Sequence, residues 1–242
     1  MLNCNLKFYY RKLINKFSKY PIIYNNGFNL QKVLGHFKID HVIDIGAYTG
    51  TYGQSLRRFG YKGNLLSFEP VKSNYLKLLN NAKKDRKWNV YERVALGFKP
   101  GKAKLYVSKK KDSSSLLRIK KIHTKIEPDS KIVGKENTKI ETLDNIIQKY
   151  KHINLSKALL KIDTQGFEYE ILLGSKKTLK KLKLVQVELS LNQLYENQKN
   201  KNLIIELLEK NNFECWNIIP GFKDKKNSRL LQYDAIYFKS KK

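Results

Sequence analysis

The sequence predicts an α/β fold with a Rossmann-like, doubly wound and mostly parallel sheet that ends in an antiparallel hairpin. Strand and helix patterns alternate along most of the chain, which is typical of a parallel sheet covered on both faces. Two apolar strands each end in a carboxylate, Asp44 and Glu69. The chain finishes with strand patterns at residues 213–219 and 230–239 joined by a loop, which is typical of an antiparallel edge hairpin.

Strands are predicted at residues 41–45, 64–68, 89–93, 159–162 and 184–189. Helical periodicity is found at residues 51–59, 71–81, 143–150, 167–173 and 202–210. A further helix at residues 29–37 is predicted to begin with Asn29 as its N-cap. Residues 94–140 form an insertion with a strand at 102–108 and a polar stretch at 109–115. A loop region of this kind over the carboxyl edge of a sheet usually decides substrate specificity.

A glycine turn follows the first strand, in the run DIGAYTG at residues 44–50. Its spacing is Gly-x-x-x-Gly, whereas Gly-x-Gly-x-x-Gly brings the backbone against a pyrophosphate. The turn therefore suits an adenosyl ligand without phosphates, and S-adenosylmethionine is the obvious example. Asp44 and the loop residues Gly46, Tyr48 and Gly50 are predicted to face its methionine part.

The second and third strands extend this predicted cofactor site. Glu69 ends the second strand about 20 residues downstream, where an acid takes the ribose hydroxyls in related sheets. Val94 and Ala95 follow the third strand, where an adenine ring can rest on apolar side chains and backbone amides.

Several separated blocks of the sequence resemble the FkbM-type S-adenosylmethionine-dependent methyltransferases. The resemblance spans about residues 40–239 and includes the runs VIDIGAYTG (42–50), SFEP (67–70), ERVALG (92–97), SSSLL (113–117), IETLD (140–144), LKIDTQGFE (160–168), LVQVEL (184–189) and YDAIY (233–237). It implies the class I methyltransferase fold, S-adenosyl-L-methionine as cofactor, and methyl transfer to a hydroxyl of a small-molecule, sugar or glycan acceptor. Gln165 departs from the family, which more often carries Glu there.

Asp163 is the main catalytic candidate because it ends a very apolar strand beside the cofactor strand. Glu188 near the end of the next strand is the second candidate, and Glu168 lies one turn into the following helix. The three carboxylates could also hold a divalent cation, although Asp163 and Glu168 equally suit a helix N-terminus. The predicted site therefore includes no assigned metal ligand.

Three residues are predicted to contact the acceptor: Ser115 and His123 in the insertion, and Gln165 after Asp163. The serine run at residues 113–115 is expected to become ordered over bound ligands. Nothing in the sequence supports these serines as nucleophiles.

The composition places limits on the class of protein. The chain has 242 residues, 41% hydrophobic content and a net charge of +28, and its lysines are spread along the whole length. Residues 1–38 are predicted to form a basic helical extension and residues 39–242 the methyltransferase domain. Residues 1–20 could contact a membrane surface as a basic amphipathic helix, although packing on the domain is favoured. Cys4 and Cys215 lack metal or disulfide spacing, which favours a cytoplasmic setting, and Cys215 is predicted to be buried.

Two alternatives to a small-molecule or sugar acceptor remain at this stage. The charge favours a nucleic-acid methyltransferase, but enzymes that methylate base amines typically carry an Asn/Asp-Pro-Pro-aromatic tetrad after the fourth strand. Residues 163–166 read DTQG instead, so ribose methylation of RNA is the version that stays open, with nucleic acid not the favoured partner. A non-enzymatic binding module is the least favoured reading, because Asp44, Glu69 and Asp163 are all present.

Overall fold

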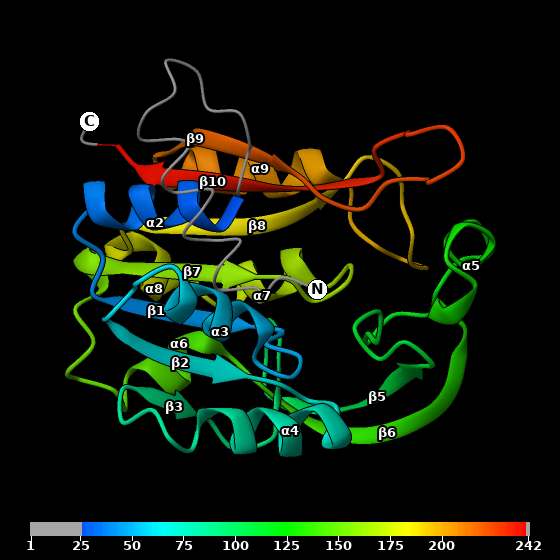
Figure 1. Cartoon of the computed structure of the whole chain (residues 1–242), viewed down its shortest axis with the longest axis horizontal. Helices are drawn as coiled ribbons and strands as arrows, with labels where there is room; N and C mark the ends of the chain where they lie inside the picture. The colour runs from blue at the N-terminus through cyan, green and yellow to red at the C-terminus, as the bar shows by residue number, and fades with distance from the viewer. Residues whose placement is uncertain (1–25, 241–242) are drawn as a thin grey trace, which may run out of the picture.

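A seven-stranded sheet runs through the centre of the computed structural model, which describes residues 26–240 (Figure 1). Its strand order is β3-β2-β1-β7-β8-β10-β9. The strands are β1 (His41–Ile45), β2 (Asn64–Phe68), β3 (Trp88–Val90), β7 (Ala158–Ile162), β8 (Leu184–Ser190), β9 (Phe213–Pro220) and β10 (Gln232–Lys239). The first five strands in this order are parallel, and β10 is antiparallel to both β8 and β9. The predicted fold class is confirmed.

Helices cover both faces of the sheet. One face carries α2 (Asn26–His36), α3 (Thr51–Arg58) and α4 (Lys72–Ala82), and the other carries α6 (Leu143–Ile147), α7 (Glu168–Leu173), α8 (Lys176–Lys181) and α9 (Lys201–Lys210). Successive strand residues point to opposite faces. Val42 and Leu159 therefore pack in the core under α2, α3 and α4, while Ile43 and Leu160 pack in the core under α6 to α9. Each buried side chain of this size contributes about 1.5–3 kcal/mol.

The insertion forms a second, smaller sheet at the carboxyl edge. It contains β4 (Ala95–Leu96), β5 (Gly101–Ser108), α5 (Lys121–Ile126), the short 3-10 helix η1 (Pro128–Ser130) and β6 (Ile132–Glu141), with strand order β4-β6-β5. Figure 1 shows α5 and the adjoining end of β6 on the right, beyond the ends of the parallel strands. The prediction of a strand at residues 102–108 is confirmed by β5. Strand β6 was not predicted because it is largely exposed and buries only Thr138.

Some boundaries and environments differ from the predictions. Strand β3 ends at Val90, three residues before its predicted end, because the chain leaves the main sheet for β4. Helix α2 begins at Asn26, so Asn29 lies inside the helix. Helix α8 was not predicted because in its run KKTLKK only Thr178 and Leu179 are buried. The prediction for Cys215 is wrong: it is exposed on the edge strand β9.

The predicted N-terminal extension is described only in part. Residues 1–25, including the proposed membrane-contacting segment 1–20, and Cys4 lie outside the described residues. Of the remainder, α2 packs Leu30, Val33 and Leu34 against the sheet. Within residues 26–240, no helix combines the length and apolar character that a membrane span requires.

Candidate active site

Polar side chains from four neighbouring strands meet at the carboxyl edge of the sheet. Asp44 on β1 is the register partner of Lys161 on β7, which in turn is the partner of Gln186 on β8. Two residues further along, Glu188 on β8 faces Asp234 on β10. Because alternate residues share a face, these side chains project from the face that carries α2 and α3.

Two glycines shape the loop after β1. Gly46 has φ of 77° and passes so close to β7 that a Cβ there would lie 1.8 Å from the Asp163 carbonyl oxygen. Gly50 has φ of 89°, and a Cβ there would lie 3.0 Å from the Trp88 ring. Tyr48 between them also adopts a left-handed conformation, with φ of 53°. The loop therefore needs glycine at both of its ends.

Glu69 is held by the backbone of this loop and of the turn that follows β2. Its carboxylate accepts hydrogen bonds from the N–H groups of Tyr48 at 2.8 Å and Val71 at 2.9 Å. Burial raises the pKa of Glu69 to about 8, although these donors oppose the rise. A buried carboxylate held at this position is ready to accept hydrogen bonds from a ligand.

A cavity of about 560 Å³ opens beside Glu69. Five of the predicted cofactor residues line it: Gly46, Tyr48, Glu69, Val94 and Ala95. Apolar walls come from residues such as Phe68, Leu96 and Phe167. We call it the adenosyl cavity, because a flat apolar wall beside a carboxylate matches the needs of an adenine and its ribose.

The other two predicted cofactor residues, Asp44 and Gly50, do not line the adenosyl cavity. Asp44 lies beneath the loop and is 1% exposed, and its Oδ1 forms an ion pair with the Nζ of Lys161 at 3.2 Å. Burial raises the pKa of Asp44, an effect that the neighbouring lysine opposes. Gly50 packs against Trp88 and Leu78.

The neighbour of Asp44 is Lys161, a residue that the sequence analysis missed. Its Nζ lies 3.2 Å from Asp44 Oδ1 and 3.5 Å from Asp163 Oδ2, and it donates to the Gly46 carbonyl at 3.2 Å. Burial would lower the pKa of Lys161, but the two carboxylates outweigh this and raise it. Lys161 therefore stays charged and ties β7 to the loop. Its signal in the sequence is a lysine inside the otherwise apolar strand ALLKI.

A second, larger cavity of about 1570 Å³ adjoins the first, and we call it the acceptor cleft. The two share Gly46, Tyr48, Asp112, Asp163 and Gln165 as lining residues. Five carboxylates and two lysines line the cleft: Asp112, Glu127, Asp163, Glu188, Asp234, Lys110 and Lys161. Three glutamines, Gln165, Gln186 and Gln232, add amide groups. The lining is acidic even though the chain is strongly basic.

The two predicted catalytic residues lie together in this cleft. The Gln165 side-chain amide donates to Asp163 Oδ1 at 2.9 Å and to Glu188 Oε2 at 3.2 Å. The Asp163 side chain lines the cleft and is 34% exposed, so part of it can be reached by a ligand. Burial, followed by the charges of Asp163, Glu168 and Asp234, raises the pKa of Glu188.

Asp234 was also missed, although it stands out as an acid in the apolar run YDAIY of β10. It lies in the acceptor cleft opposite Glu188. Burial and the nearby Asp163 raise the pKa of Asp234 to about 6. Three carboxylates therefore crowd one end of the cleft, and Lys161 is the buried cation among them.

Glu168 has a structural position. Its Oε1 accepts hydrogen bonds from the backbone N–H groups of Thr164 at 2.9 Å and Gly166 at 3.0 Å. It thus closes the loop that leads into α7. Across the described part of the chain, no group of three or more His, Cys, Asp or Glu residues is arranged to hold a metal ion.

The predicted acceptor residues have three different environments. Gln165 lines both cavities. Ser115 lines only the adenosyl cavity, and its hydroxyl donates to the Gln165 carbonyl at 2.8 Å. His123 lines the acceptor cleft and is 3% exposed, and its Nδ1 has no partner among the described residues. Burial lowers the pKa of His123 to about 4, so the ring is neutral at pH 7.

Comparisons with known proteins identify the family and the fold. The model of the FkbM methyltransferase domain matches residues 44–215. A candidate O-methyltransferase from Klebsiella pneumoniae has a similar fold, with a TM-score of 0.52, 8% identity, and coverage of 99% of this chain and 91% of that one. A candidate tRNA (m1A22) methyltransferase from Streptococcus pneumoniae, in complex with S-adenosyl-L-methionine, gives a TM-score of 0.47 and 9% identity over 88% and 73%. At such identities the likeness concerns the fold alone. No curated protein matches the chain.

Proposed function

Since the chain belongs to the FkbM family of S-adenosylmethionine-dependent methyltransferases, we propose that it methylates a hydroxyl group of a small-molecule, sugar or glycan acceptor. The observation that carries the proposal is the position of Asp163, whose carboxylate lies where the adenosyl cavity meets the acceptor cleft. A hydroxyl must lose a proton when it takes a methyl group, and a carboxylate within hydrogen-bond reach can accept it.

The residues of the adenosyl cavity fit the cofactor. Glu69 would accept hydrogen bonds from the ribose hydroxyls, and adenine would rest between the apolar walls at Val94 and Ala95. Gly46 and Tyr48 would border the methionine part, while the buried carboxylate of Asp44 favours positive charge above it. When bound, S-adenosylmethionine supplies an electrophilic methyl group on a sulfonium.

The chain's own residues then have three tasks. The sheet edge and the insertion hold the two ligands side by side, and proximity of this kind is worth about 7–11 kcal/mol of a barrier. Asp163 accepts the acceptor's proton at its cleft-facing oxygen. The ammonium of Lys161 lies 3.5 Å from Asp163 Oδ2 and places a positive charge beside the carboxylate that receives the proton.

The lining of the acceptor cleft supports a hydroxyl-rich acceptor. Carboxylates and side-chain amides, such as Glu188, Asp234 and Gln232, can accept or donate hydrogen bonds to several hydroxyls at once. His123 lines the same cleft, and its Nδ1 has no partner in the described part of the chain, so a sugar hydroxyl is a suitable partner for it. Phe222 and Tyr52 add apolar surface for the ring.

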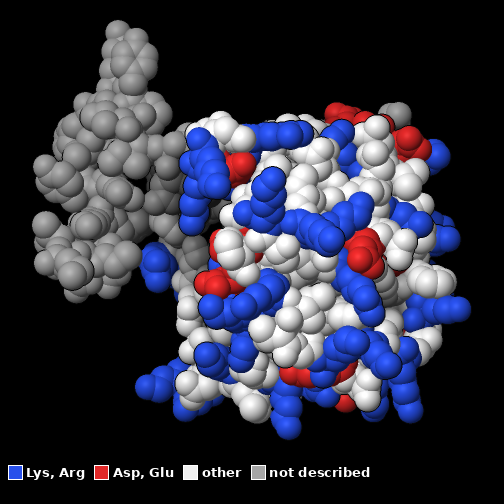
Figure 2. Space-filling model, turned by 90° about the vertical axis from the view of Figure 1, so that its right-hand side faces the viewer, with Lys and Arg blue, Asp and Glu red and all other residues white. Residues whose placement is uncertain are grey.

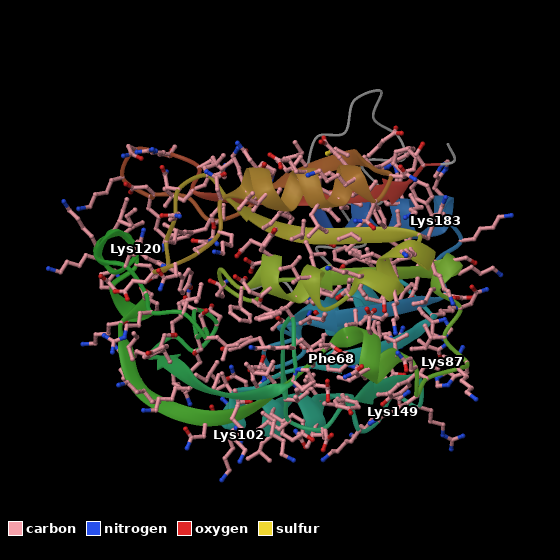
Figure 3. All side chains as sticks on the ribbon, turned by 180° about the vertical axis from the view of Figure 1, so that it is seen from behind. Phe68, Lys87, Lys102, Lys120, Lys149 and Lys183 are labelled. Atoms are coloured by element: carbon pink, nitrogen blue, oxygen red, sulfur yellow. The ribbon has the colours of Figure 1, made fainter. Side chains whose placement is uncertain are left out.

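RNA ribose methylation is the alternative, and the net charge of +28 favours it. Figure 2 shows Lys and Arg spread over the face that holds the cleft, with Asp and Glu in smaller patches among them. Figure 3 shows labelled lysines at both ends of the molecule, with Lys120 near α5 and Lys87, Lys149 and Lys183 at the opposite end. The positive charge is therefore general, whereas the cleft itself is acidic and repels phosphates. A neutral acceptor is favoured.

The test combines substrates and a variant. Purified protein is incubated with methyl-labelled S-adenosylmethionine and either neutral glycans and glycosides or RNA, and the labelled product is identified. Asp163→Asn should bind S-adenosylhomocysteine with near-normal affinity in calorimetry, while turnover falls by about 10²–10⁴. Asp129→Asn, an exposed carboxylate on η1 outside both cavities, is the control and should keep full activity. Unchanged turnover in Asp163→Asn would remove Asp163 from the mechanism, and label in RNA alone would favour the alternative.

A further inference from the structure

A buried tyrosine from the far side of the cleft reaches the catalytic carboxylates through one intermediate side chain. We propose that Tyr195 is a positioning residue, which orients the amide of Gln165 so that it donates to Asp163 and Glu188 together. The inference rests on the function proposed above for these carboxylates. Tyr195 lies in the loop between β8 and α9 and is fully buried.

The direction of the Gln165 amide follows from its three partners. The Tyr195 hydroxyl donates to Gln165 Oε1 at 2.7 Å. With the amide oxygen turned towards Tyr195, the amide nitrogen faces Asp163 at 2.9 Å and Glu188 at 3.2 Å. The two N–H protons therefore serve two carboxylates. The reversed amide would place an oxygen against both carboxylates and lose two charge-assisted hydrogen bonds.

Both members of the pair are held firmly in place. The Tyr195 ring packs edge-on against the His123 ring, with 5.4 Å between the ring centroids. Gly166 also lies against Tyr195, since a Cβ added at Gly166 would be 3.2 Å from the Tyr195 ring. The backbone N–H of Tyr195 donates to Gln198. Gln165 has φ of 59°, a left-handed conformation that its surroundings must support. Ser115 gives part of that support by donating to the Gln165 carbonyl at 2.8 Å.

The Tyr195 hydroxyl also lies 3.1 Å from the Ser113 carbonyl. Tyr195 thus joins three segments, namely the polar stretch of the insertion, the loop after β7, and its own loop after β8. The hydrogen bonds that Gln165 makes to Asp163 and Glu188 therefore depend on contacts among all three segments. The position of the base is therefore sensitive to the insertion, which also carries His123.

The charges around the carboxylate pair explain why one amide matters. Glu188 is faced by Asp163 at the end of β7, Glu168 on α7 and Asp234 on β10, and Lys161 is the cation among them. Burial, followed by repulsion from these carboxylates, raises the pKa of Glu188. The Gln165 amide and the Gln232 amide, which donate to Glu188 Oε2 at 3.2 Å and 2.6 Å, favour its ionised form and oppose this rise.

Removal of the Tyr195 hydroxyl gives a direct test that needs no acceptor. In Tyr195→Phe the ring remains but the Gln165 amide is free to turn. Asp163 and Glu188 then lose the hydrogen bonds that the amide nitrogen donates to them. Carbon-13 carboxyl NMR follows the titration of the pair, with signals assigned by Asp163→Asn and Glu188→Gln. The apparent pKa of Glu188 should rise by about one unit. The matched control is Tyr61→Phe. It removes another buried tyrosine hydroxyl, which has no hydrogen-bond partner within residues 26–240, and should leave the titration unchanged.

The outcomes separate this inference from the proposed function. A folded Tyr195→Phe protein with a wild-type titration would overturn the positioning role, even if Asp163→Asn abolishes turnover. A shifted titration together with an active Asp163→Asn enzyme would keep the positioning role and reject Asp163 as the base. If Tyr195→Phe fails to fold, Gln165→Met replaces it, because it removes the amide itself. An unshifted Glu188 titration in Gln165→Met would then overturn the inference.

Discussion

The buried ion pair between Lys161 and Asp44 makes the sharpest prediction about stability. We consider Lys161→Met, which keeps the length of the side chain and removes its charge. Asp163 remains partly in water after this change, because its side chain is 34% exposed. Asp44 is 1% exposed and has no other partner for its oxygens among the described residues. The variant therefore leaves one carboxylate buried and uncompensated.

The expected loss can be worked out in two ways. Two unit charges 3.2 Å apart attract each other by about 5 kcal/mol at an effective dielectric constant of about 20. Measured losses on breaking a buried pair from one side are about 3–5 kcal/mol. We therefore expect Lys161→Met to lower the free energy of unfolding by about 3–5 kcal/mol, or the Tm by about 6–20 °C for a chain of this size.

Urea unfolding of a small set of variants tests this reasoning. The double variant Lys161→Met/Asp44→Asn removes both charges and should be more stable than Lys161→Met alone, with a coupling of at least about 2 kcal/mol. Lys157→Met, an exposed lysine just before β7, is the control and should stay within about 0.5 kcal/mol of the wild type. If the double variant is no more stable than the single one, the loss does not come from the stranded Asp44 carboxylate and the argument is wrong.

Two further predictions concern the cofactor loop. Gly46→Ala should unfold at a lower temperature and lose S-adenosylhomocysteine binding, because its Cβ would overlap the Asp163 carbonyl. The control is Gly101→Ala, which should match the wild type because a Cβ there meets nothing within 4 Å. A Gly46→Ala protein that is stable and binds the ligand would contradict the loop geometry. Since the pKa of Glu69 is about 8 and ribose hydroxyls favour its ionised form, affinity should rise as pH increases from 6 to 9, with a proton released on binding. Calorimetry with adenosine, which has no titrating group in this range, checks the sign, and a flat profile would refute it.

The sequence predicted the parallel sheet closely because its signal is local. Strands β1 and β2 are short apolar runs with clear ends, and both have their predicted boundaries. The convergence of Glu69 and Asp163 on the adenosyl cavity also follows from the sequence, because the carboxyl ends of parallel strands share one edge. Strand β6 has no comparable signal, since an exposed strand pairs through its backbone and leaves no apolar alternation.

Other features depend on contacts between distant segments. The orientation of Asp44 towards Lys161 is decided by the register of β1 against β7, which neither strand's sequence contains. The bond between Tyr195 and Gln165 joins residues 30 positions apart and has no periodic pattern. A lysine or an acid inside an apolar strand was the available signal for Lys161 and Asp234, and both residues line the acceptor cleft.

The contrast between a basic exterior and an acidic cleft has a practical consequence for the search for substrates. Polyanions such as RNA or sulfated glycans will adhere to the outer lysines through general attraction that weakens with salt. Such adhesion leaves the target hydroxyl far from Asp163. Under the proposed function, pull-down experiments at low ionic strength will therefore rank polyanions above the neutral acceptor. Turnover measured at moderate salt is the criterion that selects for molecules able to enter the cleft.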